Sequence, residues 1–241
     1  MASRGMRGGN TGGRRARRWI ITLAVIVIVL VVLDFAARVV AQNVIATKIE
    51  QQGLSQKPTV AIGGFPFLTQ VASRDFSQVN ISVADLTEGP VTITSVKATA
   101  HGVRLKSFAF NSGTVSSLSG TAFVSFASLG NALTAQVGPL GSLLHGAGLN
   151  LSQAGPGEVK ANLSLVLTSG SATWRVSRLS GNKLDVRLVS SSGLPAPVLS
   201  SIQDVALKIP KLPLGLTVRS VNVTPQGVTG RVLGHDVSFG G

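Results

Sequence analysis

The side chains that could carry out catalysis are few in this chain and lie far apart. Its three histidines, His101, His145 and His235, share no metal-ligand spacing. There is no cysteine, which excludes a disulfide, a zinc thiolate and a thiol nucleophile. Serine is abundant, but no Gly-x-Ser-x-Gly elbow is present, and the glycine-rich stretch 138–148 lacks the Gly-Lys-Ser/Thr of a phosphate-binding loop. We therefore expect no enzymatic activity, no metal site and no cofactor.

Nearly half of the net charge of +13 lies at the N-terminus of the chain. Six arginines precede Trp19 with no acidic residue among them: Arg4, Arg7, Arg14, Arg15, Arg17 and Arg18. The remaining excess is scattered and does not alternate with aromatic residues, so we expect no binding of nucleic acid. The cluster instead predicts membrane topology, because positive residues before an apolar segment keep the N-terminus in the cytoplasm.

An apolar segment follows the arginines. Trp19 to Leu33 carries no charge, and the mostly apolar run continues through Asp34 and Arg38 to Ala41. These 23 residues would extend about 34 Å as a helix, which is enough to cross a hydrocarbon core of about 30 Å. We expect a basic cytoplasmic tail at 1–18 and a transmembrane signal-anchor at 19–41.

A cleaved signal peptide is the alternative, because small residues precede Gln42. Arg38 beside such a cleavage site would be unusual, which favours the uncleaved anchor. Both interpretations place the rest of the chain outside the plasma membrane, in a periplasm-like space.

The elements after the apolar segment follow from its periodicity. Apolar residues at helical spacing predict a helical stalk over 42–57 that ends near Gly53. From residue 58 to 241, alternation of apolar and polar residues predicts antiparallel strands. The alternating segments are 79–83, 91–93, 163–165, 184–188, 221–223 and 228–232. Turn residues separate them at 88–90, 101–102, 111–113, 180–182 and 225–227.

Two interruptions of the alternation indicate helices, at 126–136 with Ser125 as the N-cap and at 197–204. The Gly- and Leu-rich stretch 138–157 has no clear period. We expect a loop or an apolar flap there.

Six segments follow one another along the chain in a recognisable order: Gly64 to Gln70, Arg74 to Val79, Val96 to Val103, Gly120 to Leu129, Pro210 to Val218 and Val223 to Val228. Together they resemble the LmeA-type phospholipid-binding family of actinobacteria. Two positions depart from the family pattern, since Phe126 replaces a Tyr and Ser128 replaces an Asp. The resemblance covers residues 58 to 239 and implies an α+β, tubular lipid-binding-like fold. In that fold a curved antiparallel sheet wraps around helices and encloses an elongated apolar groove.

The candidate lipid contacts are the apolar residues close to these segments: Phe65, Phe67, Leu68, Phe108, Phe110, Phe123, Phe126 and Leu129. The candidate headgroup contacts are cations nearby in the sequence: Arg74, Lys97, Arg104 and Lys106. Ordinary core is the alternative for the apolar set, and a solvated strand face is the alternative for the cations. Covering half of a 16-carbon acyl chain would contribute roughly 6 kcal/mol before ordering costs, at about 0.8 kcal/mol per methylene.

The function predicted is that of an extracytoplasmic, membrane-tethered phospholipid-binding protein of the cell envelope. The resemblance implies that it holds or transfers lipid in the maintenance of envelope lipids or lipoglycans. The partners are then a phospholipid and the membrane. The alternative is a structural or adhesion module with a closed β core and no lipid ligand, since alternation does not distinguish a filled core from a liganded one.

Overall fold

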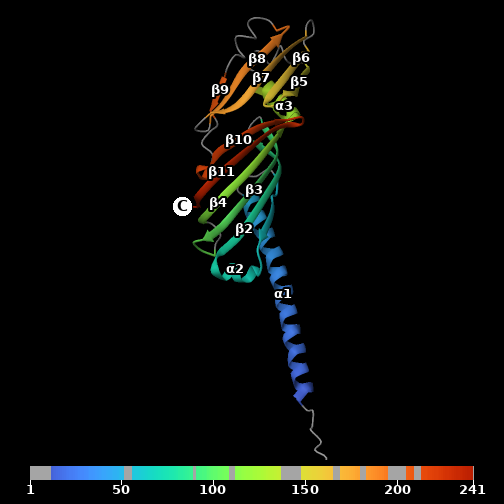
Figure 1. Ribbon diagram of the computed structural model, residues 1–241, viewed down its shortest axis with the longest axis vertical. Coiled ribbons are helices and arrows are strands. Elements are labelled where there is room, and N and C mark those ends of the chain that lie inside the picture. The colour runs from blue at the N-terminus through green and yellow to red at the C-terminus, as the bar shows by residue number, and fades with distance from the viewer. Residues whose placement is uncertain are drawn as a thin grey trace, which may run out of the picture.

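The protein consists of one long helix and two antiparallel sheets that follow one another along the long axis of the molecule (Figure 1). The structure is a computed structural model and describes residues 12–51, 56–88, 91–108, 112–136, 148–164, 169–179, 183–194, 205–208 and 213–240. Most of the described chain is strand, and neither sheet closes on itself. The predicted α+β class is confirmed, but the β residues form two sheets where one was expected.

Helix α1 (Gly12–Glu50) projects from one end of the molecule (Figure 1). Within the described residues, its segment Ile21–Glu50 is the only helix long and apolar enough to cross a membrane, with a mean hydropathy of 2.8 over its most apolar 18 residues. The apolar side chains from Ile21 to Leu33 are largely exposed. The later part of α1 packs on the first sheet through a face of small and aliphatic residues: Ala37, Ala41, Ile45, Ala46 and Ile49. One continuous helix therefore has two parts. Ile21 to Leu33, which we call the bare half of α1, is exposed, and the later part packs on the folded domain.

The first sheet has six strands in the order β1-β2-β3-β4-β11-β10. Their bounds are Thr59–Gly63 for β1, Asp75–Glu88 for β2, Val91–Leu105 for β3, Gly113–Ser125 for β4, Thr217–Thr224 for β10 and Gly227–Phe239 for β11. The short helix α2 (Phe67–Ser73) lies between β1 and β2, and a 3-10 turn, η1 (Pro213–Gly215), precedes β10. The C-terminal hairpin of β10 and β11 pairs with β4 at the side of this sheet. Residues far apart in the sequence therefore form one surface.

The second sheet has five strands in the order β5-β6-β7-β8-β9. Their bounds are Gly148–Gly155 for β5, Glu158–Ser164 for β6, Ser169–Leu179 for β7, Lys183–Ser192 for β8 and Val205–Lys208 for β9. Helix α3 (Phe126–Gln136) connects the two sheets and contacts β3, β4 and β5. Residues 148–157, expected to be loop or flap, instead form β5 and the turn after it, and the helix expected at 197–204 lies outside the described residues.

The helix predicted at 126–136 is confirmed, together with its N-cap. The Ser125 hydroxyl accepts a hydrogen bond from the backbone N–H of Ser128 at 3.1 Å, which satisfies one of the unpaired donors of the first turn. The two hydroxyl oxygens of Ser125 and Ser128 are also hydrogen bonded, at 2.9 Å. The serine that departs from the family pattern therefore takes part in the cap.

The turn predicted at His101 and Gly102 is wrong, because both residues lie inside β3. Gly102 has φ +61°, and a Cβ there would lie 2.6 Å from the hydroxyl of Ser116 on β4. This irregularity moves the alternation by one residue, so that Val103 and Ala100 contact the same core. The glycine allows an irregularity inside the strand. In the sequence, such a glycine looks the same as a turn residue.

Candidate functional site

The described residues form two separate apolar cores. The lower core lies between α1 and the first sheet and contains Ala46, Val60, Ile62, Phe67, Phe76, Val103, Val115 and Val237. The upper core lies around α3 and joins the two sheets, and it contains Phe126, Leu151, Val159, Ala161 and Val223. The first sheet contributes residues to both cores, one at each end of its long strands. The middle section of the sheet therefore lies between the two cores.

Strand pairing shows which side chains of the middle section share a face. One row across the sheet is Val83, Val96, Ala122, Gly230 and Val221, and the next is Ile81, Ala98, Gly120, Val232 and Val218. Ile81 contacts the lower core, so these rows lie on the face that α1 covers further down. We call this face the inner face.

The opposite, outer face of the same strands is polar. One of its rows is Ser82, Lys97, Thr121 and Arg231, and another includes Asn80, Thr99 and Ser119. The Asn80 carboxamide oxygen accepts hydrogen bonds from Thr99 at 2.9 Å and from Gln78 at 3.0 Å. A sheet with one wet and one apolar face needs a cover for the apolar face.

Nine residues of the two rows on the inner face belong to neither core. Val218 is buried, and the other eight form what we call the apolar band: Val83, Val96, Ala98, Gly120, Ala122, Val221, Gly230 and Val232. All eight are half-buried. A Cβ built on Gly230 would meet no described atom within 4 Å. Among the described residues, the band is thus an apolar surface of small side chains with open space above its centre.

A cavity borders the upper core beside α3. It has a volume of about 450 Å³ and is lined by Phe126, Ala127, Gly130, Asn131, Leu149, Asn150 and Leu151. Phe126 and Leu151 belong both to this lining and to the upper core, and Val228 packs against the same core from the first sheet. The volume lies within the range of about 300–1,000 Å³ that is usual for small-molecule sites.

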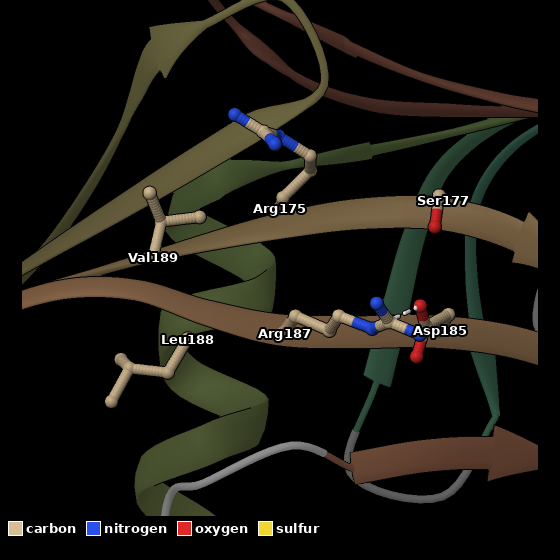
Figure 2. A pocket seen from close by; sticks show the side chains of 6 residues that line it. All are labelled: Arg175, Ser177, Asp185, Arg187, Leu188 and Val189. Atoms are coloured by element: carbon tan, nitrogen blue, oxygen red, sulfur yellow. Dashed lines mark ion pairs between the residues drawn. The ribbon is translucent and has the colours of Figure 1, made fainter.

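A second hollow, of about 310 Å³, lies on the second sheet, over β7 and β8 (Figure 2). Its lining includes Arg175 and Arg187, whose guanidinium groups would suit an anion. Each already has a carboxylate partner, Glu158 at 2.6 Å for Arg175 and Asp185 at 2.7 Å for Arg187. Trp174 and Val176 on β7 pack against the upper core, so this hollow lies on the opposite face of the sheet. It is less suited than the apolar band to hold an acyl chain.

Two charged residues of α1 were not among the candidates, although they organise one end of the domain. Asp34 is 5% exposed, and its carboxylate accepts the backbone N–H of Phe67 at 2.8 Å and that of Leu68 at 2.7 Å. Arg38, one helical turn later, donates to the carbonyl oxygen of Gly64 at 2.6 Å. Asp34 thereby caps the N-terminus of α2. The N-cap residue of α2, Pro66, provides no side-chain hydrogen bond of this kind.

The predicted lipid contacts do not form one cluster. Phe67 is buried in the lower core, Phe126 in the upper core, and Leu129 packs against the upper core. Phe65, Leu68 and Phe108 are exposed, by 62%, 43% and 60%. Phe110 lies outside the described residues.

Phe123 pairs with Ser95 and Thr229 and follows Thr121 by two residues, which places it on the outer face. Its neighbours Ala122 and Val124 lie on the inner face. The roles of all these residues in binding remain predictions, and the small residues of the apolar band are better placed than Phe123.

The predicted headgroup cations are all exposed. Arg74 and Lys106 lie together, because the Arg74 guanidinium donates to the carbonyl oxygen of Lys106 at 3.1 Å. Arg104 forms an ion pair with Asp75 at 3.2 Å, and Lys97 lies on the outer face between Ser82 and Thr121. Three of the four cations therefore gather near α2, away from the apolar band.

Comparison with known proteins supports the resemblance found in the sequence. A model of the LmeA-like phospholipid-binding family matches residues 32–232, which is most of the chain. No curated protein and no solved structure matches. The match begins two residues before Asp34, so it includes the part of α1 that packs on the domain. The chain belongs to the LmeA-like phospholipid-binding family.

Proposed function

We propose that this protein is tethered to the plasma membrane by α1, with its domain outside the cell's cytoplasm, and that it binds a phospholipid with the acyl chain along the apolar band. The observation that carries the proposal is the apolar band itself. Val, Ala and Gly residues of β2, β3, β4, β10 and β11 form a continuous apolar surface that belongs to neither described core. Family membership supports a phospholipid as the ligand.

The binding energy comes from burying methylene groups. Covering eight acyl carbons would contribute roughly 6 kcal/mol, from which the ordering of the chain subtracts. The small side chains favour this use, because Ala98, Ala122 and Gly230 leave room near the sheet where larger residues would fill it. No polar chemistry is needed in the band for affinity.

The topology rests on the N-terminal arginines and on the bare half of α1. Six arginines before Trp19 favour a cytoplasmic N-terminus, and the exposed apolar residues from Ile21 to Leu33 suit a hydrocarbon environment. A C-terminal reporter that is active only outside the cytoplasm should therefore be active on this chain. Activity of a cytoplasmic reporter at the same site would contradict the topology.

We propose a binding role without catalysis, in the maintenance of envelope lipids or lipoglycans. Among the described residues, no group of three or more His, Asp and Glu side chains is arranged to hold a metal ion. The arrangement that the structure does build is apolar, which suits holding or passing on a lipid. These parts of the proposal depend on the apolar band being a ligand site.

The test is native mass spectrometry of the full chain, released from membranes in detergent and then exchanged repeatedly into fresh detergent. The proposal predicts that one phospholipid per chain remains after the loosely associated lipid is gone. Organic extraction would identify the lipid. A chain that retains no phospholipid above background would favour the structural or adhesion module.

A further inference from the structure

We propose that the end of the domain around α2 is a second membrane contact, which rests on the headgroup region of the same membrane that α1 crosses. This inference depends on the proposed function in one respect, namely that α1 spans the membrane. The contact is made by what we call the end surface: Phe65, Leu68, Arg74, Arg104, Lys106 and Phe108.

The end surface is held by hydrogen bonds to a single turn of α1, from Asp34 to Arg38. The Asp34 carboxylate holds the first two N–H groups of α2, and Arg38 holds the carbonyl oxygen of Gly64. Residues 64–68 are therefore fastened to one turn of α1. Figure 1 shows α2 beside α1 at the end of the domain from which the helix emerges. Phe65 and Leu68, although exposed, are held close to the point where α1 leaves the domain.

The connection between β3 and β4 joins the same surface. The Leu105 N–H donates to the carbonyl oxygen of Arg74 at 2.9 Å, and the Arg74 guanidinium reaches the carbonyl oxygen of Lys106. The same guanidinium lies 5.4 Å from the centre of the Phe108 ring, in a cation–π arrangement. Phe108 is thus presented next to α2 and remains 60% exposed.

The length of the uncharged segment sets the height of the membrane relative to this surface. The 15 residues from Trp19 to Leu33 rise about 22 Å, which is less than a hydrocarbon core of about 30 Å. The remaining distance of about 8 Å corresponds to about five more residues, as far as Arg38. On that stretch Phe35 is 54% exposed, whereas Asp34 is buried against α2. The edge of the hydrocarbon therefore reaches the level at which α2 is fastened.

The composition of the end surface matches this position. Three exposed large apolar side chains, Phe65, Leu68 and Phe108, stand where the hydrocarbon ends. Three exposed cations, Arg74, Arg104 and Lys106, lie with the half-exposed carboxylate of Asp75, which pairs with Arg104. Exposed Phe and Leu side chains beside basic residues suit a surface that rests at the boundary between acyl chains and anionic headgroups. A solvated strand end would need none of the three apolar residues.

The experiment uses the full chain in vesicles of phosphatidylcholine and phosphatidylglycerol. Since the chain has no cysteine, single substitutions allow labelling of one site with an environment-sensitive fluorophore. Phe65→Cys and Phe108→Cys report on the end surface, V27C reports on the bare half of α1, and S119C on the outer face is the solvent control. Quenching by lipids labelled near the headgroup or deep in the acyl chain then gives the depth of each site.

We expect loss of fluorescence at positions 65 and 108 with the shallow quencher, at position 27 with the deep quencher, and at position 119 with neither. Quenching at 27 without quenching at 65 and 108 would overturn the second contact and leave the anchor intact. No quenching at 27 would refute the anchor itself. Adding Lys106→Glu to the labelled Phe108 variant should reduce the shallow quenching, because it replaces a cation that faces the headgroups. Unchanged quenching in that variant would contradict the electrostatic part of the contact.

Discussion

Replacing Gly230 with Leu should block the apolar band without unfolding the protein. A Cβ at this position meets no described atom within 4 Å, and the backbone of Gly230 is not in the left-handed region. Glycine inside a strand destabilises by roughly 0.5–1 kcal/mol relative to alanine. The thermal stability of Gly230→Leu should therefore equal or exceed that of the wild type.

The effect on lipid binding follows from the volume that the new side chain takes. The four carbons of Leu displace about four acyl methylenes, which removes about 3 kcal/mol at about 0.8 kcal/mol each. This corresponds to an affinity about 100-fold weaker, at about 1.4 kcal/mol for each factor of ten. The assay is displacement of a fluorescent phospholipid from detergent-solubilised full chain, with circular dichroism for the fold.

The matched control is Ser119→Leu, which adds the same side chain to the exposed outer face of β4. It should leave the affinity unchanged. Lipid binding in the apolar band would be refuted if Gly230→Leu stayed folded and bound lipid as tightly as this control. Unfolding of Gly230→Leu would show that the space above Gly230 is filled and that the band is ordinary core.

Three further changes test the parts of the fold that position the band. Asp34→Ala removes the cap of α2 and should lower the free energy of unfolding by about 1–2 kcal/mol in chemical denaturation, whereas Asn43→Ala on the exposed side of α1 should change it little. Phe126→Ala should cost about 3–5 kcal/mol and make the connection between the sheets sensitive to limited proteolysis, while Phe108→Ala at an exposed site should have neither effect. Ser125→Ala should destabilise by about 1 kcal/mol, measured by thermal melting, because the first turn of α3 loses its acceptor.

The elements that local patterns determine were predictable from the sequence. Alternation at 79–83 and 228–232 indicated strands, and Ser125 before an apolar helical stretch indicated the start of α3. The prediction of a helix at 126–136 succeeded because both of its signals, the N-cap residue and the apolar spacing, are local in the sequence. Gly102 misled because a glycine inside an irregular strand resembles a turn.

The features that depend on distant pairing were not predictable. β4 pairs with β11, about a hundred residues later in the chain. Because of this pairing, β10 and β11 belong to the first sheet, and the strands between them and β4 form the second sheet. The same pairing puts Phe123 on the polar outer face, although its aromatic ring made it a candidate for the ligand site. The apolar band is built from Ala, Gly and Val, whose small side chains give no chemical signal in the sequence.

Asp34 and Arg38 did carry a signal that sequence reasoning left unused. Two opposite charges at i and i+4 in an otherwise apolar helix are expensive in hydrocarbon and therefore indicate a partner. The partner is the backbone of residues 64–68. Its identity depends on tertiary structure, but the need for one could have been inferred.

Lipid binding in the apolar band is tested most directly by crosslinking with a phospholipid that carries a photoreactive group in its acyl chain. The full chain is reconstituted with this lipid and irradiated, and the modified peptides are mapped by mass spectrometry. If the acyl chain lies along the apolar band, crosslinks should appear on β3, β4 and β11 around Ala98, Ala122 and Gly230, and Gly230→Leu should abolish them while crosslinks to α1 persist. Crosslinks confined to α1 in the wild type would contradict lipid binding in the band.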